Sequence, residues 1–249
     1  MDSDQKQKKI DVKSCIDRIE NEIYQILKPL GFRKHGRTLH RFVSEDISQV
    51  VGFQCGESYR EETHLMWVRI GIRVPESYEW TFEPQKPKKF YHEYECNMRS
   101  TLGLTDQQEL AVRANGGCIP DGTTYDLRND LDEIIEDISR KIKQDVIPAL
   151  GVLSSREAIL AHRRDYPRYD TFYWQILLEE AMIYGRNHNI DKAKELFEAY
   201  CREIEEKAKH PIVLGGKVID RSDTIACHLK MMDELARKLG LRESPSSPS

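Results

Sequence analysis

The chain has 249 residues, which is enough for one large domain or two modest ones with a substantial buried core. Hydrophobic residues make up 39% and charged residues 32%, and the formal net charge of -4 disfavours general attraction to nucleic acid. The longest apolar run falls short of the roughly 18 residues that span a bilayer, so no membrane segment is predicted.

The first ten residues, MDSDQKQKKI, are polar and lack the apolar core of a signal peptide, so we expect a cytoplasmic location. Residues 1–10 are predicted to be a disordered tail. The cysteines are far apart in the sequence and form no CxxC pair: Cys15, Cys55, Cys96, Cys118, Cys201 and Cys227. Zinc and redox motifs have closer spacing, so neither a metal nor a cofactor is predicted.

A helix is predicted over residues 12–30. Its apolar residues recur at helical spacing: Val12, Ile16, Ile19, Ile23, Ile26, Leu27 and Leu30. Asp11 is a suitable N-cap, and Gly31 can end the helix in a left-handed conformation. Pro29 lies in the last turn, where we expect local distortion.

Three strands should follow, at residues 33–43, 47–55 and 65–74. In the third, Met66, Val68, Ile70, Ile72 and Val74 share one face, while Trp67, Arg69 and Arg73 share the other. Such alternation indicates half-buried antiparallel strands with one packed face and one free face. The predicted fold class is therefore α+β, an antiparallel sheet covered on one face by helices.

Three stretches of this region, IYQILKPLGFRKHGRTLHRF, VVGFQCG and VRIGIRVP, resemble the opening of a bacterial family known as domain of unknown function 4304. In that family a helix ends in a Leu-Lys-Pro-x-Gly-Phe-like phrase, which corresponds to Leu27–Lys34 here. The resemblance covers residues 15 to about 150. It implies the fold, but the family brings no established activity.

The next segment, residues 76–100, contains several prolines and is predicted to be at least partly an irregular loop, as is the glycine-rich segment 115–124. Asp126 is a suitable N-cap for a strong helix over residues 127–147, which Pro148 and Gly151 close. This helix and the one at 12–30 are expected to cover the Val51/Ile70 face of the sheet.

After Gly151 the pattern is helical up to about residue 241, with helices predicted at 155–164, 171–187, 191–209 and 223–239 and a possible hairpin around 214–217. The second and third of these helices resemble one tetratricopeptide-type helical hairpin. We therefore predict an α+β domain at 11–151, a helical region at 152–241 packed on it, and a disordered tail at 242–249. The side chains expected to make that packing are Phe172, Ile176, Leu196, Phe197 and Tyr200.

The free face of the sheet is one candidate binding site. Trp67, Arg69 and Arg73 lie on it, together with Gln54 from the preceding strand. Tryptophan and arginine are enriched at interface hot spots, so these residues could bind another protein. The alternative is a solvated face with cross-strand charge pairs.

A second candidate is the aromatic and basic segment from Tyr78 to Tyr94, where Lys86, Lys88, Lys89 and Tyr91 could hold phosphates and stack bases. Neighbouring glutamates offset these lysines, so nucleic-acid binding is not the favoured interpretation. The loop around Cys118 could bind an anion or present a thiol, but it matches no phosphate-binding motif.

No combination of residues specifies a reaction, so catalytic residues are not predicted and the question of an enzyme stays open. The favoured interpretation is a cytoplasmic, bacterial protein-interaction module whose partner is another protein. The alternative is an enzyme or a nucleic-acid processing factor with its site in the loops at 76–124.

Overall fold

The structure is a computed structural model that describes residues 10–56, 64–76, 88–105, 122–166, 169, 176–209, 212–214, 217–219, 222–238 and 240–242. Five sequence-based predictions lie outside the described residues: nearly all of each of the two disordered tails, and the roles given to Lys86, Cys118 and Phe172. The chain forms two compact units. Unit 1 comprises Met1–Val74 and Lys86–Thr171, and unit 2 comprises Pro75–Gln85 and Phe172–Ser249.

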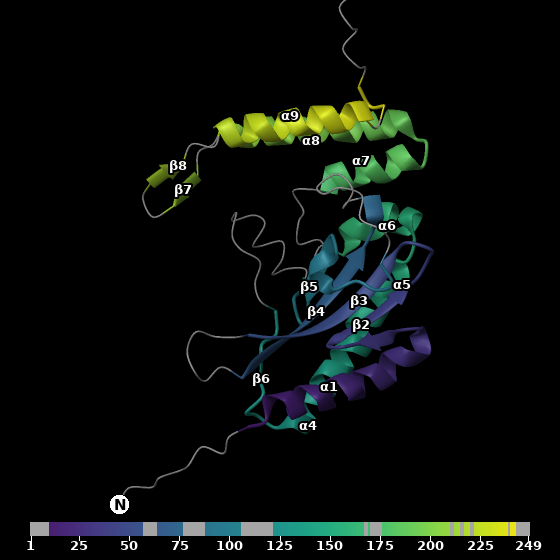
Figure 1. The fold of residues 1–249 in the computed structure, drawn as a ribbon, viewed down its shortest axis with the longest axis vertical. Helices are drawn as coiled ribbons and strands as arrows, with labels where there is room; N and C mark the ends of the chain where they lie inside the picture. Colours follow the sequence, from purple (N-terminus) through teal and green to yellow (C-terminus); the bar gives the residue numbers. More distant parts are fainter. Residues whose placement is uncertain are drawn as a thin grey trace, which may run out of the picture. The chain divides into compact units, whose positions relative to one another are not determined.

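Unit 1 is built on an antiparallel sheet in which five strands are neighbours in chain order, from β1 to β5, while β6 pairs with β4 (Figure 1). The strands are β1 (Arg33–His35), β2 (Thr38–Phe42), β3 (Ser48–Cys55), β4 (Leu65–Arg73), β5 (Met98–Thr101) and β6 (Tyr125–Asp126). The register sets Leu39 opposite Val51 and Val51 opposite Ile70. The predicted pairing of the three alternating segments into one sheet is confirmed.

One face of this sheet is apolar and buried under helices, as predicted. Helices α1 (Val12–Leu27) and α4 (Leu131–Lys141) lie side by side beneath the sheet and are joined by the ion pair of Arg18 with Asp132 (Figure 1). Lys34 shares the apolar face with Leu39, and its Nζ lies 3.1 Å from a carboxylate oxygen of Glu20 on α1. The buried core residues on this face include Leu39, Val51, Val68, Ile70 and Ile72 from the strands and Ile16, Ile19, Ile23, Ile134 and Ile138 from the helices.

Both ends of α1 follow the prediction. The Asp11 side chain accepts a hydrogen bond from the Ser14 N–H, and Gly31 has a left-handed φ of 89°. Between the helix and Gly31 lies a single 3-10 turn, η1 (Lys28–Leu30), which contains Pro29. The proline therefore produces the expected local distortion, because it has no N–H to continue the α-helical pattern.

The segment 33–43 was predicted as one strand, but it is a β-hairpin. Strands β1 and β2 are joined by Gly36 and Arg37, and Gly36 has a φ of 57°. Glycine at the first position of a two-residue loop is the pattern of a type II′ turn, which reverses the chain without splaying the strands. As a result, Arg33, Lys34 and His35 lie on a short edge strand and Arg37 on its turn, while His40 and Arg41 lie on β2.

The second long helix of unit 1 begins later than predicted. Asp126 is not its N-cap, because it pairs with Leu65 in the sheet and its carboxylate accepts hydrogen bonds from Arg128. Asp130 caps α4 instead, accepting from the N–H groups of the next turn at 2.8 and 3.2 Å. The chain continues through the π-helical turn η3 (Ile142–Val146) into α5 (Ile147–Val152), α6 (Arg156–His162) and the 3-10 turn η4 (Arg163–Asp165).

In unit 2, helix α8 (Ile190–Ala208) packs against α7 (Ile176–Arg186) and α9 (Ser222–Lys238) (Figure 1). Strands β7 (Ile212–Leu214) and β8 (Lys217–Ile219) form the expected hairpin. Leu196, Phe197 and Tyr200 form a buried cluster with α7 and α9 of their own unit. The expectation that they pack on the α+β domain stays a prediction. Among the described helices, none is long and apolar enough to cross a membrane.

Candidate functional site

The second face of the sheet was predicted to be free, but part of it is covered. Residues 88–97, which we call the cover segment, pass over it and include the 3-10 turn η2 (Glu93–Glu95). A Cβ atom on Gly71 would lie 2.6 Å from Cys96 Sγ, and a Cβ on Gly52 would lie 2.6 Å from Glu93 Oε2. Glycine within a strand permits such a close approach, so these two residues make room for the cover segment.

The cover segment crosses the sheet along one row of paired residues, His35, Thr38, Gly52 and Arg69 on β1 to β4. The Phe90 ring lies 3.7 Å from the ring of His35, measured between centroids. The next contacts are His92 Nδ1 with Thr38 Oγ1 at 3.0 Å, and the Glu93 carboxylate against Gly52. The segment therefore brings aromatic rings and a carboxylate to one end of the sheet.

Glu95 fixes the conformation of the cover segment. Its carboxylate accepts a hydrogen bond of 2.9 Å from the His92 N–H and forms an ion pair with Lys88. Burial acts to raise the pKa of Glu95, but these two contacts outweigh it and leave the pKa below its usual value. Glu95 is therefore charged, and its carboxylate is held by His92 and Lys88. It orients the neighbouring His92 and Glu93.

An open pocket of about 390 Å³ lies where the β1–β2 turn, the end of β3 and η2 meet. Its lining residues are His35, Gly36, Arg37, Thr38, Phe53, Gln54, His92, Glu93 and Tyr94. Within the described part of the chain, the Arg37 guanidinium has no hydrogen bond or ion pair, and the Glu93 carboxylate has no cation. Tyr94 is 60% exposed, and its ring stacks on that of His92 with 5.0 Å between centroids. The pocket thus combines exposed rings with polar groups that have unused bonding capacity.

Three of the four predicted partner-binding residues lie next to this pocket. Gln54 lines it and accepts a hydrogen bond of 3.1 Å from Arg69 Nε. Arg69 also donates to Thr101, and Trp67 Nε1 donates to Thr124 Oγ1 at 3.0 Å. We call Gln54, Trp67 and Arg69 the Arg69 strip. Each is at least partly exposed and is held by a hydrogen bond within unit 1.

Arg73, the fourth of these residues, is not a surface residue. It is only 7% exposed, and its guanidinium lies 4.0 Å from the centroid of the Tyr91 ring in the cover segment. The expectation of an exposed Arg73 is wrong because strand alternation assigns the face but not what lies over it. This contact is a buried cation–π interaction that helps to hold the cover segment on the sheet.

The residues of the predicted nucleic-acid site are not gathered into one surface. Lys88 is paired with Glu95, and Lys89 is exposed. Tyr91 is 4% exposed, and its hydroxyl accepts a hydrogen bond from the Lys88 N–H, so the ring cannot stack on a base. The alternative of an enzyme or nucleic-acid processing factor stays a prediction, since most of the 76–124 loops lie outside the described residues.

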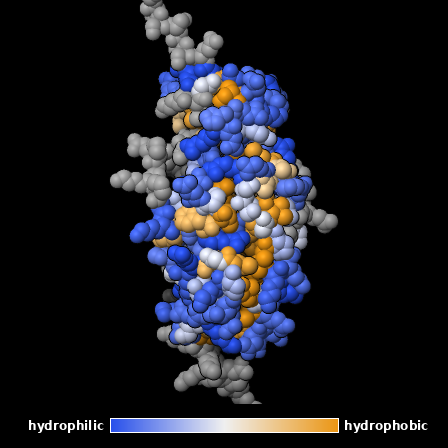
Figure 2. All heavy atoms as spheres, turned by 90° about the vertical axis from the view of Figure 1, so that its right-hand side faces the viewer, coloured by the Kyte–Doolittle hydropathy of each residue, from blue (hydrophilic) through white to orange (hydrophobic). Residues whose placement is uncertain are grey.

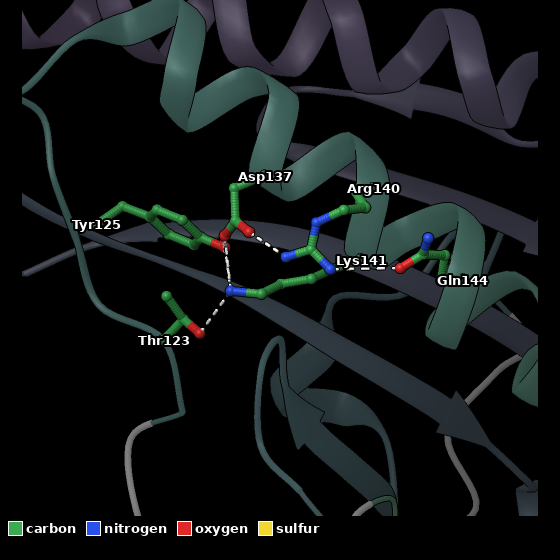
Figure 3. Close-up of polar contacts among 6 residues, drawn as sticks. All are labelled: Thr123, Tyr125, Asp137, Arg140, Lys141 and Gln144. Carbon is green, nitrogen blue, oxygen red and sulfur yellow. Dashed lines mark hydrogen bonds and ion pairs between the residues drawn. The ribbon is translucent and has the colours of Figure 1, made fainter.

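A second polar cluster lies between β6 and α4 (Figure 3). The Tyr125 hydroxyl donates to Asp137 Oδ2 at 2.9 Å, and Lys141 Nζ donates to the same oxygen at 2.6 Å and to Thr123 Oγ1 at 3.0 Å. Burial raises the pKa of Tyr125, and the hydrogen bond to Asp137 adds to this rise. Tyr125 therefore keeps its proton, and the cluster ties α4 to β6 through hydrogen bonds and the ion pair of Lys141 with Asp137.

Neither metal ligation nor a reactive thiol is supported by the described side chains. They contain no group of three or more His, Cys, Asp or Glu residues placed to hold a metal ion. The described cysteines are free thiols, and burial raises the pKa of Cys55, Cys96 and Cys201. A raised pKa disfavours the thiolate, which is the nucleophilic form.

Three pocket residues were not predicted as site residues: His35, Arg37 and Thr38. His92, Glu93 and Tyr94 lie in the aromatic and basic segment that was predicted as the alternative site, but they were not singled out there. The two strand glycines also carried a signal in the sequence, because an interior glycine marks close approach of another segment. That signal tells neither which segment approaches nor which of its side chains reach the pocket.

A family model described as Domain of unknown function (DUF4304) matches residues 6–151, which is more than half of the chain and includes every residue of the pocket. No curated protein and no solved structure matches the chain. The family match ends at residue 151, within α5, and does not reach α7 and α8, so their likeness to a tetratricopeptide unit stays a prediction. The chain belongs to the DUF4304 family.

Proposed function

We propose that the chain is a protein-interaction module and that the Arg69 strip and the exposed Tyr94 bind its partner. One observation carries this proposal: a strip of arginine, tryptophan and glutamine side chains, each hydrogen-bonded within the domain, borders an open pocket beside an exposed tyrosine. Tryptophan, tyrosine and arginine are the residue types that dominate binding energy at interfaces. A bacterial origin and a cytoplasmic location, both expected from the sequence, are part of the proposal.

Preorganisation supports this choice. The hydrogen bonds from Arg69 to Gln54 and Thr101 restrict the arginine rotamers, and the bond from Trp67 to Thr124 restricts the indole. A side chain that is ordered before binding loses less entropy, a saving of about 0.5–1.5 kcal/mol for each side chain. The strip can therefore contribute to affinity although its side chains are only partly exposed.

The described surface of unit 1 also has a suitable composition. Figure 2 shows one side of the molecule, where hydrophobic residues lie between hydrophilic ones. In the described part of unit 1, the exposed large hydrophobic side chains come from separate elements: Leu30, Phe42, Tyr94 and Val152. A mixed surface of this kind is typical of non-obligate interfaces, whose apolar fraction is about that of the remaining surface.

The experiment is affinity capture from the native host with the full chain and three variants, quantified by mass spectrometry. We expect one protein to be recovered by the wild type and to be strongly reduced with Tyr94→Ala and with Arg69→Ala. Lys143→Ala, which removes an exposed lysine from η3, is the matched control and should recover it fully. Nucleic acid is assayed in the same eluates.

Identical protein recovery by all four forms would refute the proposed surface. Nucleic acid that co-elutes with the wild type and disappears with the pocket variants would favour the alternative function instead.

A further inference from the structure

The pocket contains a carboxylate that the described fold does not use. Glu93 lies against Gly52, half-buried, and among the described residues it has neither a cation nor a hydrogen-bond donor. A partly desolvated carboxylate without donors is unfavourable, since each of its oxygens can accept two hydrogen bonds. The ligand that suits it best presents two N–H groups side by side, because such a pair binds a carboxylate bidentately.

Gln54 narrows the choice of ligand. Its Oε1 already accepts from Arg69 Nε, so the side-chain amide is oriented and its NH₂ group is left as a donor at the pocket wall. The pocket therefore presents a donor from Gln54 and an acceptor from Glu93. The Watson–Crick edge of guanine has the complementary pattern: the O6 acceptor beside the N1–H and N2–H₂ donors. Adenine would direct its N6–H₂ donor toward the NH₂ donor of Gln54, and these two groups cannot hydrogen-bond to each other.

The remaining lining residues suit the other parts of a nucleotide. The ring of Tyr94, which stacks with His92 and is 60% exposed, can stack on a flat base, which is worth about 1–3 kcal/mol for each base in single-strand binding proteins. Arg37 on the β1–β2 turn is exposed, forms no ion pair among the described residues, although its charge acts on Asp17 and Glu20 of α1, and can bind phosphate. A volume of about 390 Å³ is within the range of small-molecule pockets.

We propose that this pocket is a binding site for a guanine mononucleotide, with Glu93 and Gln54 on the base edge and Arg37 on the phosphate. An arginine side chain of a partner protein would also offer paired N–H groups. The positive charges of Arg37 and Arg69 near the pocket disfavour a cation and favour a ligand that carries an anion. The inference does not rest on the proposed protein-binding function, since a nucleotide could bind whether or not a partner protein does.

Isothermal titration calorimetry on the full chain tests this proposal, with GMP, IMP, AMP and guanosine as probes. We expect saturable GMP binding, weaker IMP binding because inosine lacks the N2 amino group, and still weaker AMP binding. Glu93→Gln should weaken GMP binding by about tenfold and remove the preference over IMP, because the amide replaces one of two acceptors with a donor. Arg37→Ala should weaken GMP binding and leave guanosine binding unchanged.

Glu45→Gln is the matched control, because it makes the same chemical change at the opposite end of the sheet, in the turn between β2 and β3. It should bind GMP like the wild type. Circular dichroism melts of each variant establish that the fold is intact, and Arg37→Ala alters an exposed turn residue that is not needed for packing.

Three results would overturn the proposal: no saturable binding of GMP, equal affinity for GMP and AMP, or unchanged GMP affinity in Glu93→Gln. Binding only to a guanine-containing RNA oligonucleotide, and not to GMP, would also overturn it in favour of a nucleic-acid site. Partner capture by the Glu93→Gln chain is a separate readout, so failure here is distinguishable from failure of the proposed interaction surface.

Discussion

The Sγ atom of Cys96 lies above Gly71, in the space that a Cβ atom on this glycine would need. Cys96 is 2% exposed and packs with Val50 and Tyr91, so it acts as a small hydrophobic side chain. Burial raises its pKa, and the thiol stays protonated. This contact fastens the cover segment to β4, and the pocket exists only while the cover segment is in place.

Gly71→Ala should therefore destabilise unit 1. The added methyl group would lie 2.6 Å from Cys96 Sγ, and relief of such overpacking costs about 1–3 kcal/mol. Chemical denaturation should show this loss. Gly151→Ala is the control, because nothing lies within 4 Å of the position that its new methyl group would take, and its free energy of unfolding should not fall.

Arg73 should contribute to the stability of unit 1. Arg73→Ala removes a buried side chain that lies 4.0 Å from the Tyr91 ring, and we expect a loss of about 1–3 kcal/mol. Arg33→Ala, on the exposed edge strand, should change the free energy of unfolding by less than about 0.5 kcal/mol. Equal thermal midpoints of the two variants would contradict the burial of Arg73.

Gln49 is a buried polar residue whose hydrogen bonds link β3 to the end of α5. Its Nε2 donates to the carbonyl oxygens of Leu150 at 2.6 Å and Leu153 at 3.1 Å, and its Oε1 accepts from Arg41. Gln49→Leu should cost about 2–4 kcal/mol, because it leaves these groups without their partner. Urea denaturation measures this loss in the free energy of unfolding. If Gln49→Leu shows no loss, water must make the hydrogen bonds that the Gln49 amide made.

His40 should make stability depend on pH. Burial lowers its pKa from 6.5 to about 4, and its Nε2 has no hydrogen-bond partner among the described residues. The unfolded chain therefore binds a proton more readily than the folded chain. The contribution of neutral His40 to the free energy of unfolding is fully present above about pH 6.5. It is lost as the pH falls toward 4, by about 3 kcal/mol in total.

The measurement is the free energy of unfolding of the wild type and His40→Leu at about pH 7 and about pH 4.5. The variant lacks this titration and should lose less stability on acidification. Parallel pH profiles for the two proteins would show that His40 binds its proton equally well in the folded state.

The buried cluster of unit 2 makes a separate prediction. Leu196 is 7% exposed and packs between α7 and α9, so Leu196→Ala should cost about 2–5 kcal/mol. Met231 on α9 is 51% exposed, and Met231→Ala should cost under about 1 kcal/mol. The measurement is a thermal melt followed by the helical circular dichroism signal. Similar losses of stability in both variants would contradict the burial of Leu196 in this cluster.

The sequence by itself determined the elements that repeat a simple pattern. The helical stripe from Val12 to Leu30, with Asp11 and Gly31 at its ends, predicted α1 and its N-cap, and Gly31 ends the 3-10 turn η1 that follows Leu27. Strict alternation predicted β3, β4 and their antiparallel pairing. These predictions succeed because local backbone geometry sets which side chains share a face, and burial of the apolar face then selects the pairing.

Only the tertiary structure decided what covers the other face. The alternation of β4 assigns Arg73 to the polar face, but its burial depends on Tyr91, which lies 18 positions later in the sequence. The pocket likewise requires Gly52 and Gly71 to admit the cover segment. Contacts between distant segments depend on close packing in three dimensions, which the periodicity of a single strand does not encode.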